Sequence, residues 1–380
     1  MFKFEKIIET AASKIIPVAI NKSRCAKLRS RLSKCNRCIE SCPVNGISID
    51  KSEIKLNNNC IYCGLCASKC PNNAIYIQEP TERNLYKYAV ELGEKGNTIV
   101  LTCSKNEESS DAAFKVPCLG SLSFEFIFGL DSLPFDVNVI FSEDKCKECE
   151  IKKGIDNYYD TLHRVRNLRD RLNMKINSIK HMEKTPVIKR NKDSTSDEVD
   201  DERREFIFSV FQYAKKLPNY AIKYFLGLDD GSKESKTIKQ NPTAEKFSIL
   251  RKELIKVDKA YSEIEIDEFP KPKLVNECRF CKACVILCPM GALEYEENGD
   301  DLNIILIKNA CTGCGLCVEV CYYKSLKLES RNVNDFLSNS RDILISGKKR
   351  KCSICKKVFL SSEHIDACSD CLKKGKSSWR

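Results

Sequence analysis

Residues 60–71 carry four cysteines at a spacing that few folds can accommodate. Cys60, Cys63 and Cys66 recur at every third position, and Cys70 follows four residues later, directly before Pro71. A loop with a thiolate at every third residue can wrap its sulfurs around three corners of one iron–sulfur cube. The fourth cysteine points away and completes a second cube, so such runs must occur in pairs. We therefore expect partner runs elsewhere in the chain.

The chain contains three further runs of this kind. Two are complete, and the second ends before Tyr322 instead of proline: Cys278, Cys281, Cys284 and Cys288, then Cys311, Cys314, Cys317 and Cys321. The third run, Cys35, Cys38 and Cys42, lacks its first cysteine because Leu32 occupies that position. Cys25 is the free candidate for the missing ligand. The alternative is a three-iron cluster held by three cysteines, with Cys25 unused.

These runs resemble those of bacterial-type ferredoxins that hold two [4Fe–4S] clusters. The resemblance implies two such modules, residues 25–80 and 269–330, in which each cube takes three ligands from one run and the fourth from its partner. The implied ligand sets are Cys25, Cys35, Cys38 and Cys70 for cluster one; Cys42, Cys60, Cys63 and Cys66 for cluster two; Cys278, Cys281, Cys284 and Cys321 for cluster three; and Cys288, Cys311, Cys314 and Cys317 for cluster four. A repeated turn and short alternating stretch at 44–49, 72–77 and 290–295 supports an internal repeat that does not depend on the cysteines.

Residues 81–182 change to alternating helix and strand. Helices are expected at 83–92 and 124–130, and buried strands at 98–102, 113–117 and 137–141. Each strand is followed by cysteine: Cys103, Cys118, and then Cys146 with Cys149. The carboxyl ends of parallel strands meet at one edge of a sheet, where ligands bind. If these strands are parallel neighbours, the four cysteines converge there.

This arrangement, with the sequence Val-Pro-Cys-Leu-Gly at 116–120, resembles the iron–sulfur domain of the hydrogenase delta-subunit family, a partner of heterodisulfide reductases. The resemblance covers roughly 70 residues and implies a [2Fe–2S] cluster on Cys103, Cys118, Cys146 and Cys149. Structural zinc on the same four thiolates is an alternative. Redox chemistry of the Cys146/Cys149 dithiol is a third, which would leave the other two cysteines without a role.

A last cysteine set lies at residues 348–374. Cys352 and Cys355 form one pair, and Cys368 and Cys371 form a second pair after a short apolar turn. Paired Cys-x2-Cys at this separation is typical of a zinc ribbon, in which four thiolates surround Zn²⁺. His364 could replace one thiolate, but four cysteines suffice.

The remaining segments carry no recognisable chemistry. Residues 1–24 are expected to hold an amphipathic helix over 2–20, and residues 156–182 a long surface helix. The stretch 183–268 reads as linkers and helices, with disorder-like composition at 189–204 and 229–243 and helices at 205–217 and 244–257.

Cysteine usage and charge bound the class of protein. A chain of 380 residues with 24 cysteines, no expected signal peptide and no apolar run of about 20 residues indicates a reduced, cytoplasmic, metal-binding protein. The formal net charge of +11 suggests a polyanion partner. If all 24 cysteines are thiolates on five clusters of core charge about +2 and one Zn²⁺, that charge falls to about −1. The basic residues then offset the metal sites, so nucleic acid is an unlikely partner.

The sequence thus predicts an α+β multidomain protein that resembles polyferredoxin-type subunits. Its expected function is to pass single electrons between cytoplasmic redox proteins, as a subunit or partner of an oxidoreductase. The alternative is an iron–sulfur oxidoreductase with thiol/disulfide chemistry at Cys103, Cys118, Cys146 and Cys149. With three histidines and no Gly-rich dinucleotide or phosphate loop, acid–base or nucleotide-dependent catalysis has no visible machinery.

Overall fold

The computed structural model describes residues 18–50, 52–78, 81–106, 114–174, 177–183 and 247–372. These residues lie in one compact unit formed by 1–185 and 241–380. The expected helix at 205–217 and most of the expected linkers lie outside the described residues. Among the helices that are described, none is long and apolar enough to cross a membrane.

The N-terminal module, residues 18–78, is built from two short antiparallel strand pairs around its cysteine loops. Its strands pair antiparallel, β1 (Val18–Ile20) with β4 (Ile75–Ile77) and β2 (Ile47–Ile49) with β3 (Ile54–Leu56). Its helices are the single turns η1 (Lys22–Arg24), α2 (Ala26–Arg29), α3 (Arg37–Ser41) and α4 (Leu65–Ser68). The strands expected after two of the cysteine runs are therefore present as β2 and β4.

The expectation of a helix as far as residue 20 was wrong at its end. Residues 2–17 lie outside the described residues, but residues 18–20 form β1, in which Val18 pairs with Ile77. Pro17 precedes this strand, and proline disfavours helical backbone in the residue before it. Pairing with β4 then buries Val18 in the core of the module.

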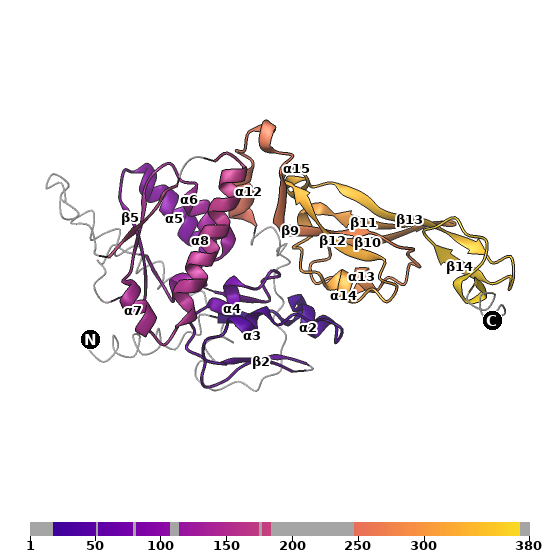
Figure 1. Cartoon of the computed structure of the whole chain (residues 1–380), viewed down its shortest axis with the longest axis horizontal. Helices are drawn as coiled ribbons and strands as arrows, with labels where there is room; N and C mark the ends of the chain where they lie inside the picture. Colours follow the sequence, from indigo (N-terminus) through magenta and orange to yellow (C-terminus); the bar gives the residue numbers. More distant parts are fainter. Residues whose placement is uncertain are drawn as a thin grey trace, which may run out of the picture. The chain divides into compact units, whose positions relative to one another are not determined.

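The central domain, residues 81–183, contains a four-stranded parallel sheet in the order β6-β5-β7-β8. The strands are β5 (Ile99–Cys103), β6 (Phe114–Val116), β7 (Val137–Ile140) and β8 (Ile179–Met182). Its helices are α5 (Glu82–Glu94), η2 (Leu119–Ser121), α6 (Phe124–Asp131), α7 (Glu143–Glu148) and α8 (Lys153–Arg171). The long helix α8 packs against α6 and η2 (Figure 1). This confirms the alternating α/β pattern and the parallel neighbours β6, β5 and β7.

The long helix expected at 156–182 is shorter, and its end was assigned wrongly. Helix α8 ends at Arg171, and Asn173 has a φ of 55°, the left-handed conformation that commonly terminates a helix. The chain then returns to the sheet, where Ile179 pairs with Val137 and is buried. The apolar spacing of three between Ile176 and Ile179 is compatible with a helix, but Ile179 lies in strand β8 of the sheet.

The C-terminal module is larger than the expected ferredoxin segment. The antiparallel pair β9 (Glu265–Leu274) and β12 (Leu326–Asn332) lies beside a second sheet in the order β10-β11-β13-β14. The strands of that sheet are β10 (Leu293–Asn298), β11 (Asp301–Ile307), β13 (Arg341–Lys351) and β14 (Val358–Ser361). Its short helices are α13 (Ala283–Ile286), η4 (Lys308–Ala310), α14 (Leu316–Glu319) and α15 (Val333–Leu337). Strand β13 pairs with both β11 and β14, so the cysteine pairs at the C-terminus extend from the same sheet.

An aromatic core joins the central domain to the C-terminal module. Helix α12 (Ser248–Leu254), where a helix over 244–257 was expected, is followed by η3 (Lys259–Tyr261). The ring of Phe247 meets Phe269 and Phe336 edge to face at 5.2 and 5.5 Å, and Phe124 of α6 meets Phe269 at 5.6 Å. These contacts bury apolar rings from four separate segments in one core.

Candidate metal centres

The structure gathers Cys25, Cys35, Cys38 and Cys70 at one place in the N-terminal module. Burial, together with the nearby Cys70, Cys35 and Cys25, raises the pKa of the Cys38 thiol to about 12. Burial likewise raises the pKa of Cys25, which lies at the start of α2 near Cys70 and Cys35. The cysteine that is displaced in the sequence is therefore next to the three others in space.

The second group is formed by Cys42 and the regular run at Cys60, Cys63 and Cys66. Burial raises the pKa of the Cys66 thiol to about 12, with Cys63, Cys38, Cys60 and Cys42 as its charged neighbours. Cys63 is buried, and its neighbours are again Cys42 and Cys60. Each group in this module thus combines three sulfurs of one run with the last sulfur of the other.

The C-terminal module repeats the same exchange. Burial raises the pKa of Cys284 to about 12, and its neighbours are Cys278, Cys281 and Cys321. Burial raises the pKa of Cys314 to about 11, and its neighbours are Cys311 and Cys288. Cys317, whose thiol pKa is also raised by burial, lies near Cys311, Cys314 and Cys288.

The last cysteine of each run accepts a hydrogen bond from the backbone N–H four residues later. The N···S distances are 3.1 Å for Gly46 to Cys42, 3.2 Å for Ala74 to Cys70, 3.3 Å for Ala292 to Cys288 and 3.2 Å for Ser325 to Cys321. The repeated turn after each run explains this regularity, because it folds the backbone back over the sulfur. Such N–H donors stabilise thiolate charge and help to set the potential of a bound cluster.

The raised pKa values indicate that these clustered cysteines need a cationic partner in order to exist as thiolates. Four thiols held together away from water resist ionisation, because desolvation and mutual repulsion both disfavour the thiolates. A cationic metal centre removes this penalty, since the bound ions offset the thiolate charges. The donor set is therefore suited to soft, multiply charged metal centres.

The four cysteines of the central domain line one small cavity at the carboxyl ends of the parallel strands. Cys103 is the last residue of β5, Cys118 follows β6, and Cys146 and Cys149 come from α7 and its end. Burial raises the pKa of Cys118 to about 12, with Cys103, Cys63 and Cys146 as charged neighbours. The volume of the cavity is about 30 Å³.

The C-terminal cysteines are packed more tightly than the others. Within the described parts of the chain, one set of three or more potential ligand atoms lies with all members within 4.8 Å of one another: Cys352, Cys355, Cys368 and Cys371. The sulfurs of Cys355 and Cys368 are 3.7 Å apart. Four thiolates around one ion at about 2.3 Å stand about 3.8 Å apart, so this set has the spacing of a single tetrahedral ion. His364 is not a member of the set.

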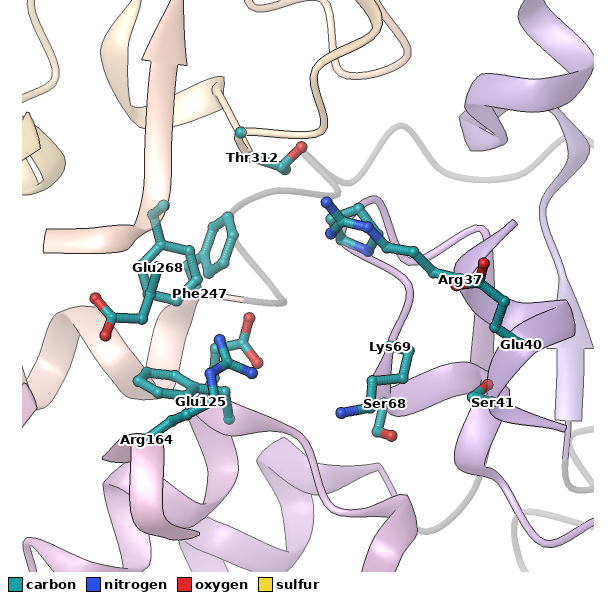
Figure 2. Close-up of a pocket in the computed structure, with 14 residues that line it drawn as sticks. Arg37, Glu40, Ser41, Ser68, Lys69, Glu125, Arg164, Phe247, Glu268 and Thr312 are labelled. Carbon is teal, nitrogen blue, oxygen red and sulfur yellow. The ribbon is translucent and has the colours of Figure 1, made fainter. Parts of the chain in front are cut away.

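A larger cavity, which no sequence motif predicts, lies beside the cysteine loops. It has a volume of about 520 Å³ and is lined by groups from all three parts of the compact unit. Figure 2 shows Arg37 and Lys69 of the N-terminal module facing Arg164 and Glu268. Thr312, between two cysteines of the C-terminal module, also lines it. The charged residues that line this cavity come from distant segments, so no local sequence motif predicts it.

Comparison with known proteins agrees with the cysteine geometry. Residues 277–325 match the 4Fe-4S dicluster domain family, and residues 55–76 match the 4Fe-4S binding domain family. The chain therefore contains two ferredoxin-type 4Fe-4S regions, one in the N-terminal module and one in the C-terminal module. The hydrogenase delta-subunit resemblance of the central domain is not shown by these matches and stays a prediction.

Two curated relatives share part of this chain. A 54-residue stretch is 33% identical to pyruvate synthase subunit PorD of Methanothermobacter marburgensis, covering 14% of this chain and 58% of the relative. A 52-residue stretch is 40% identical to PorD of Methanocaldococcus jannaschii, covering 13% of this chain and 57% of the relative. The chain thus spans little more than half the length of these relatives. No solved structure matches the chain significantly.

Proposed function

We propose that this protein is a multi-cluster electron carrier that passes single electrons between cytoplasmic redox partners, as a subunit or close partner of an oxidoreductase complex. The observation that carries the proposal is the exchange of cysteines between runs, which produces four separate groups of sulfurs that are buried or half-buried except for the exposed Cys281. The matched relatives are named as subunits of a pyruvate synthase, which supports a role within an assembly.

The proposed ligand sets follow the four groups. Cluster one takes Cys25, Cys35, Cys38 and Cys70; cluster two takes Cys42, Cys60, Cys63 and Cys66; cluster three takes Cys278, Cys281, Cys284 and Cys321; cluster four takes Cys288, Cys311, Cys314 and Cys317. Each [4Fe–4S] cluster would supply one-electron redox chemistry. The protein contributes the thiolates, excludes water by burial, and donates backbone N–H groups to sulfur.

The two remaining cysteine sets are proposed to hold different metals. The spacing of Cys352, Cys355, Cys368 and Cys371 suits one Zn²⁺. The sulfurs of Cys103, Cys118, Cys146 and Cys149 line a common cavity without that tight spacing, which favours a [2Fe–2S] cluster over a single zinc ion. The zinc site would then have a structural role, unlike the five redox centres, since zinc has no redox chemistry.

Metal analysis of anaerobically purified protein tests these assignments. We expect about 18 iron and one zinc per chain, from four cubes, one two-iron centre and one ribbon ion, with matching acid-labile sulfide. About 16 iron and two zinc would make the central site structural. Absence of acid-labile sulfide, or of signals from reduced clusters in electron paramagnetic resonance (EPR), would contradict the proposal as a whole.

A second candidate function is thiol/disulfide chemistry at the central site. The convergence of Cys103, Cys118, Cys146 and Cys149 on one cavity is the observation that favours it. Against it, the cavity has a volume of about 30 Å³, far below the roughly 300–1,000 Å³ of pockets that hold a small-molecule substrate. A Cys118→Ser variant assayed for disulfide reduction separates the two functions, because an unchanged rate excludes catalysis at this site.

A further inference from the structure

We propose that the five redox centres form a single unbranched path in the order central site, cluster two, cluster one, cluster four, cluster three. The inference rests on the proposed function, because it orders the centres that the function requires. Electron tunnelling falls steeply with distance and is favoured through packed protein, so the side-chain contacts between neighbouring cysteine groups determine the order. Four junctions carry the path.

The first junction joins the central site to cluster two. Cys118 and Cys149 pack in the same apolar cluster as Cys63, together with Leu65 and Ile151. The contact is close, because a Cβ added at Gly64 would lie 2.8 Å from the Cβ of Ser121 in η2. One hydrogen bond crosses the contact, from the Ser68 hydroxyl to the Gly120 carbonyl at 3.3 Å.

The second and fourth junctions lie inside the two modules. In the N-terminal module, Cys38 of cluster one and Cys66 of cluster two belong to one apolar cluster and are electrostatic neighbours. In the C-terminal module, Cys284 of cluster three and Cys317 of cluster four have the same relationship. Each pair of cubes therefore shares one packed core.

The third junction joins the two modules, and it brings cluster one against cluster four. Cys35 and Cys314 pack against one apolar cluster of Ala26, Leu316 and Val320. Polar contacts surround this cluster. Arg29 donates to the Ile286 carbonyl at 2.5 Å, the Lys34 N–H donates to Glu319 at 3.3 Å, and the Thr312 hydroxyl donates to the Asn72 side chain at 2.6 Å.

The two ends of the path are the places where partners can reach it. At one end, Lys105 pairs with Glu150 at 2.7 Å beside the central cysteines, and both side chains are about half exposed. At the other end, Cys281 of cluster three is exposed. The cysteine loop there is held by the segment after β14, because the Cys278 N–H donates to the Ser362 hydroxyl at 2.7 Å. Electrons are therefore expected to enter at one end and leave at the other.

Magnetic coupling between reduced clusters tests the order without an activity assay. In EPR of the fully reduced protein, loss of the central centre in a Cys118→Ser variant should sharpen the cluster-two signal and leave the C-terminal module unchanged. Loss of cluster three in a Cys281→Ser variant should sharpen the cluster-four signal and leave the N-terminal module unchanged. Coupling of the central centre to either C-terminal cluster would overturn the order.

A wedge at the third junction tests transfer between the modules. Ala26 is 3% exposed and lies in the contact, so Ala26→Trp should separate the modules; Leu32→Trp, at a side chain 64% exposed in the same segment, is the matched control. After mixing with limiting reductant, freeze-quench EPR should show electrons equilibrating between modules at least tenfold more slowly in Ala26→Trp only. Equal rates in both variants would contradict the junction.

The outcomes separate this inference from the proposed function. If the wild-type protein lacks the expected iron and sulfide, the proposed function fails. If all centres are present and reducible but couple in another order, only the path fails. Should Ala26→Trp lose iron, the coupling pattern in the two cysteine variants still decides the order, because it does not depend on the wedge.

Discussion

Gly154, at the start of α8, lies directly against the Cys118 side chain. A Cβ added at position 154 would stand 2.5 Å from the Cys118 sulfur, closer than such atoms approach in proteins. The backbone of Gly154 is also held in place, since its N–H donates to the Ile151 carbonyl at 2.7 Å. The small residue therefore keeps space for one sulfur of the central site.

Gly154→Ala should displace the Cys118 sulfur and empty the central site selectively. The side chain of Cys118 can rotate away, whereas the backbone around residue 154 is packed against Gly120. We expect about two fewer iron atoms per chain, with the four cubes retained. Iron analysis and EPR of the reduced protein measure this.

Asp156→Ala, at an exposed position two residues along α8, is the matched control and should keep its full iron content. Unchanged iron in Gly154→Ala would show that the site tolerates a shifted sulfur. Loss of iron from all centres would indicate general misfolding instead of a local effect.

Tyr86 and Glu253 form a buried hydrogen bond that ties α5 to α12. The Tyr86 hydroxyl donates to Glu253 at 2.6 Å, and Glu253 also accepts from Lys256 at 2.8 Å. Tyr86→Phe should lower the free energy of unfolding by about 1–3 kcal/mol, because the buried carboxylate loses a donor. Urea titration of the metal-loaded protein under anaerobic conditions measures the change.

The stability that the Tyr86–Glu253 hydrogen bond contributes should decrease at high pH. Burial and then Glu253 raise the pKa of Tyr86 in the folded protein, whereas the unfolded value is about 10. The contribution of the bond is therefore complete below pH 10 and is lost as the pH rises further. Tyr88→Phe, at a side chain 49% exposed on the same helix, should change stability little at any pH. A Tyr86→Phe protein as stable as wild type at pH 7 would contradict the prediction.

Arg331 is a buried cation beside a proposed ligand of cluster four. It is 2% exposed, and its guanidinium donates to the carbonyl oxygens of Lys308 and Cys311 at 3.0 and 2.9 Å. A nearby positive charge favours the reduced, more negative state of a cluster. Arg331→Met should therefore lower the potential of cluster four on the order of 60 mV, the shift for a tenfold change in a one-electron equilibrium.

Redox titration followed by EPR resolves this prediction. Arg331→Lys, which keeps the charge, should retain most of the wild-type potential. The signals of the N-terminal module should not move in either variant, because Arg331 lies in the C-terminal module. An equal fall in both variants would assign the effect to lost hydrogen bonds and not to lost charge.

The sequence predicted which cysteines lie close together better than it predicted the contacts between distant segments around them. Cysteine spacing predicted which sulfurs lie close together, and the structure places Cys25 beside Cys35 and Cys70, while its role as a ligand stays a prediction. The convergence of Cys103 and Cys118 followed from strand order, since parallel strand ends share an edge. These inferences depend on local spacing and general sheet geometry, which a sequence carries directly.

Contacts between distant segments were not predictable in the same way. The local sequence around Gly154 does not predict its close approach to Cys118. The local sequence around Ala26 does not predict that it packs against Leu316. Strand β8 was read as helix because Ile179 continued an apolar spacing of three, although Asn173 was an available stop signal. Tertiary pairing decided the conformation there.

The proposed zinc site should release its metal on acidification, because protons compete with Zn²⁺ for the four thiolates. Without metal, hydrogen bonds from the backbone N–H groups of Cys355 and Cys368 lower the pKa of Cys352 to about 6, whereas hydrogen bonds with the neighbouring thiols raise the pKa of Cys371 to about 12. Because the folded pKa of Cys352 is depressed, the stabilisation from its thiolate is full above pH 9 and declines as the pH falls. Zinc should therefore be retained at pH 7 and lost as the pH falls towards 5, as a chromogenic chelator would report. His364→Ala should leave the release curve unchanged, since His364 is outside the tight set. Retention of zinc well below pH 5, or a shifted curve in His364→Ala, would contradict this assignment.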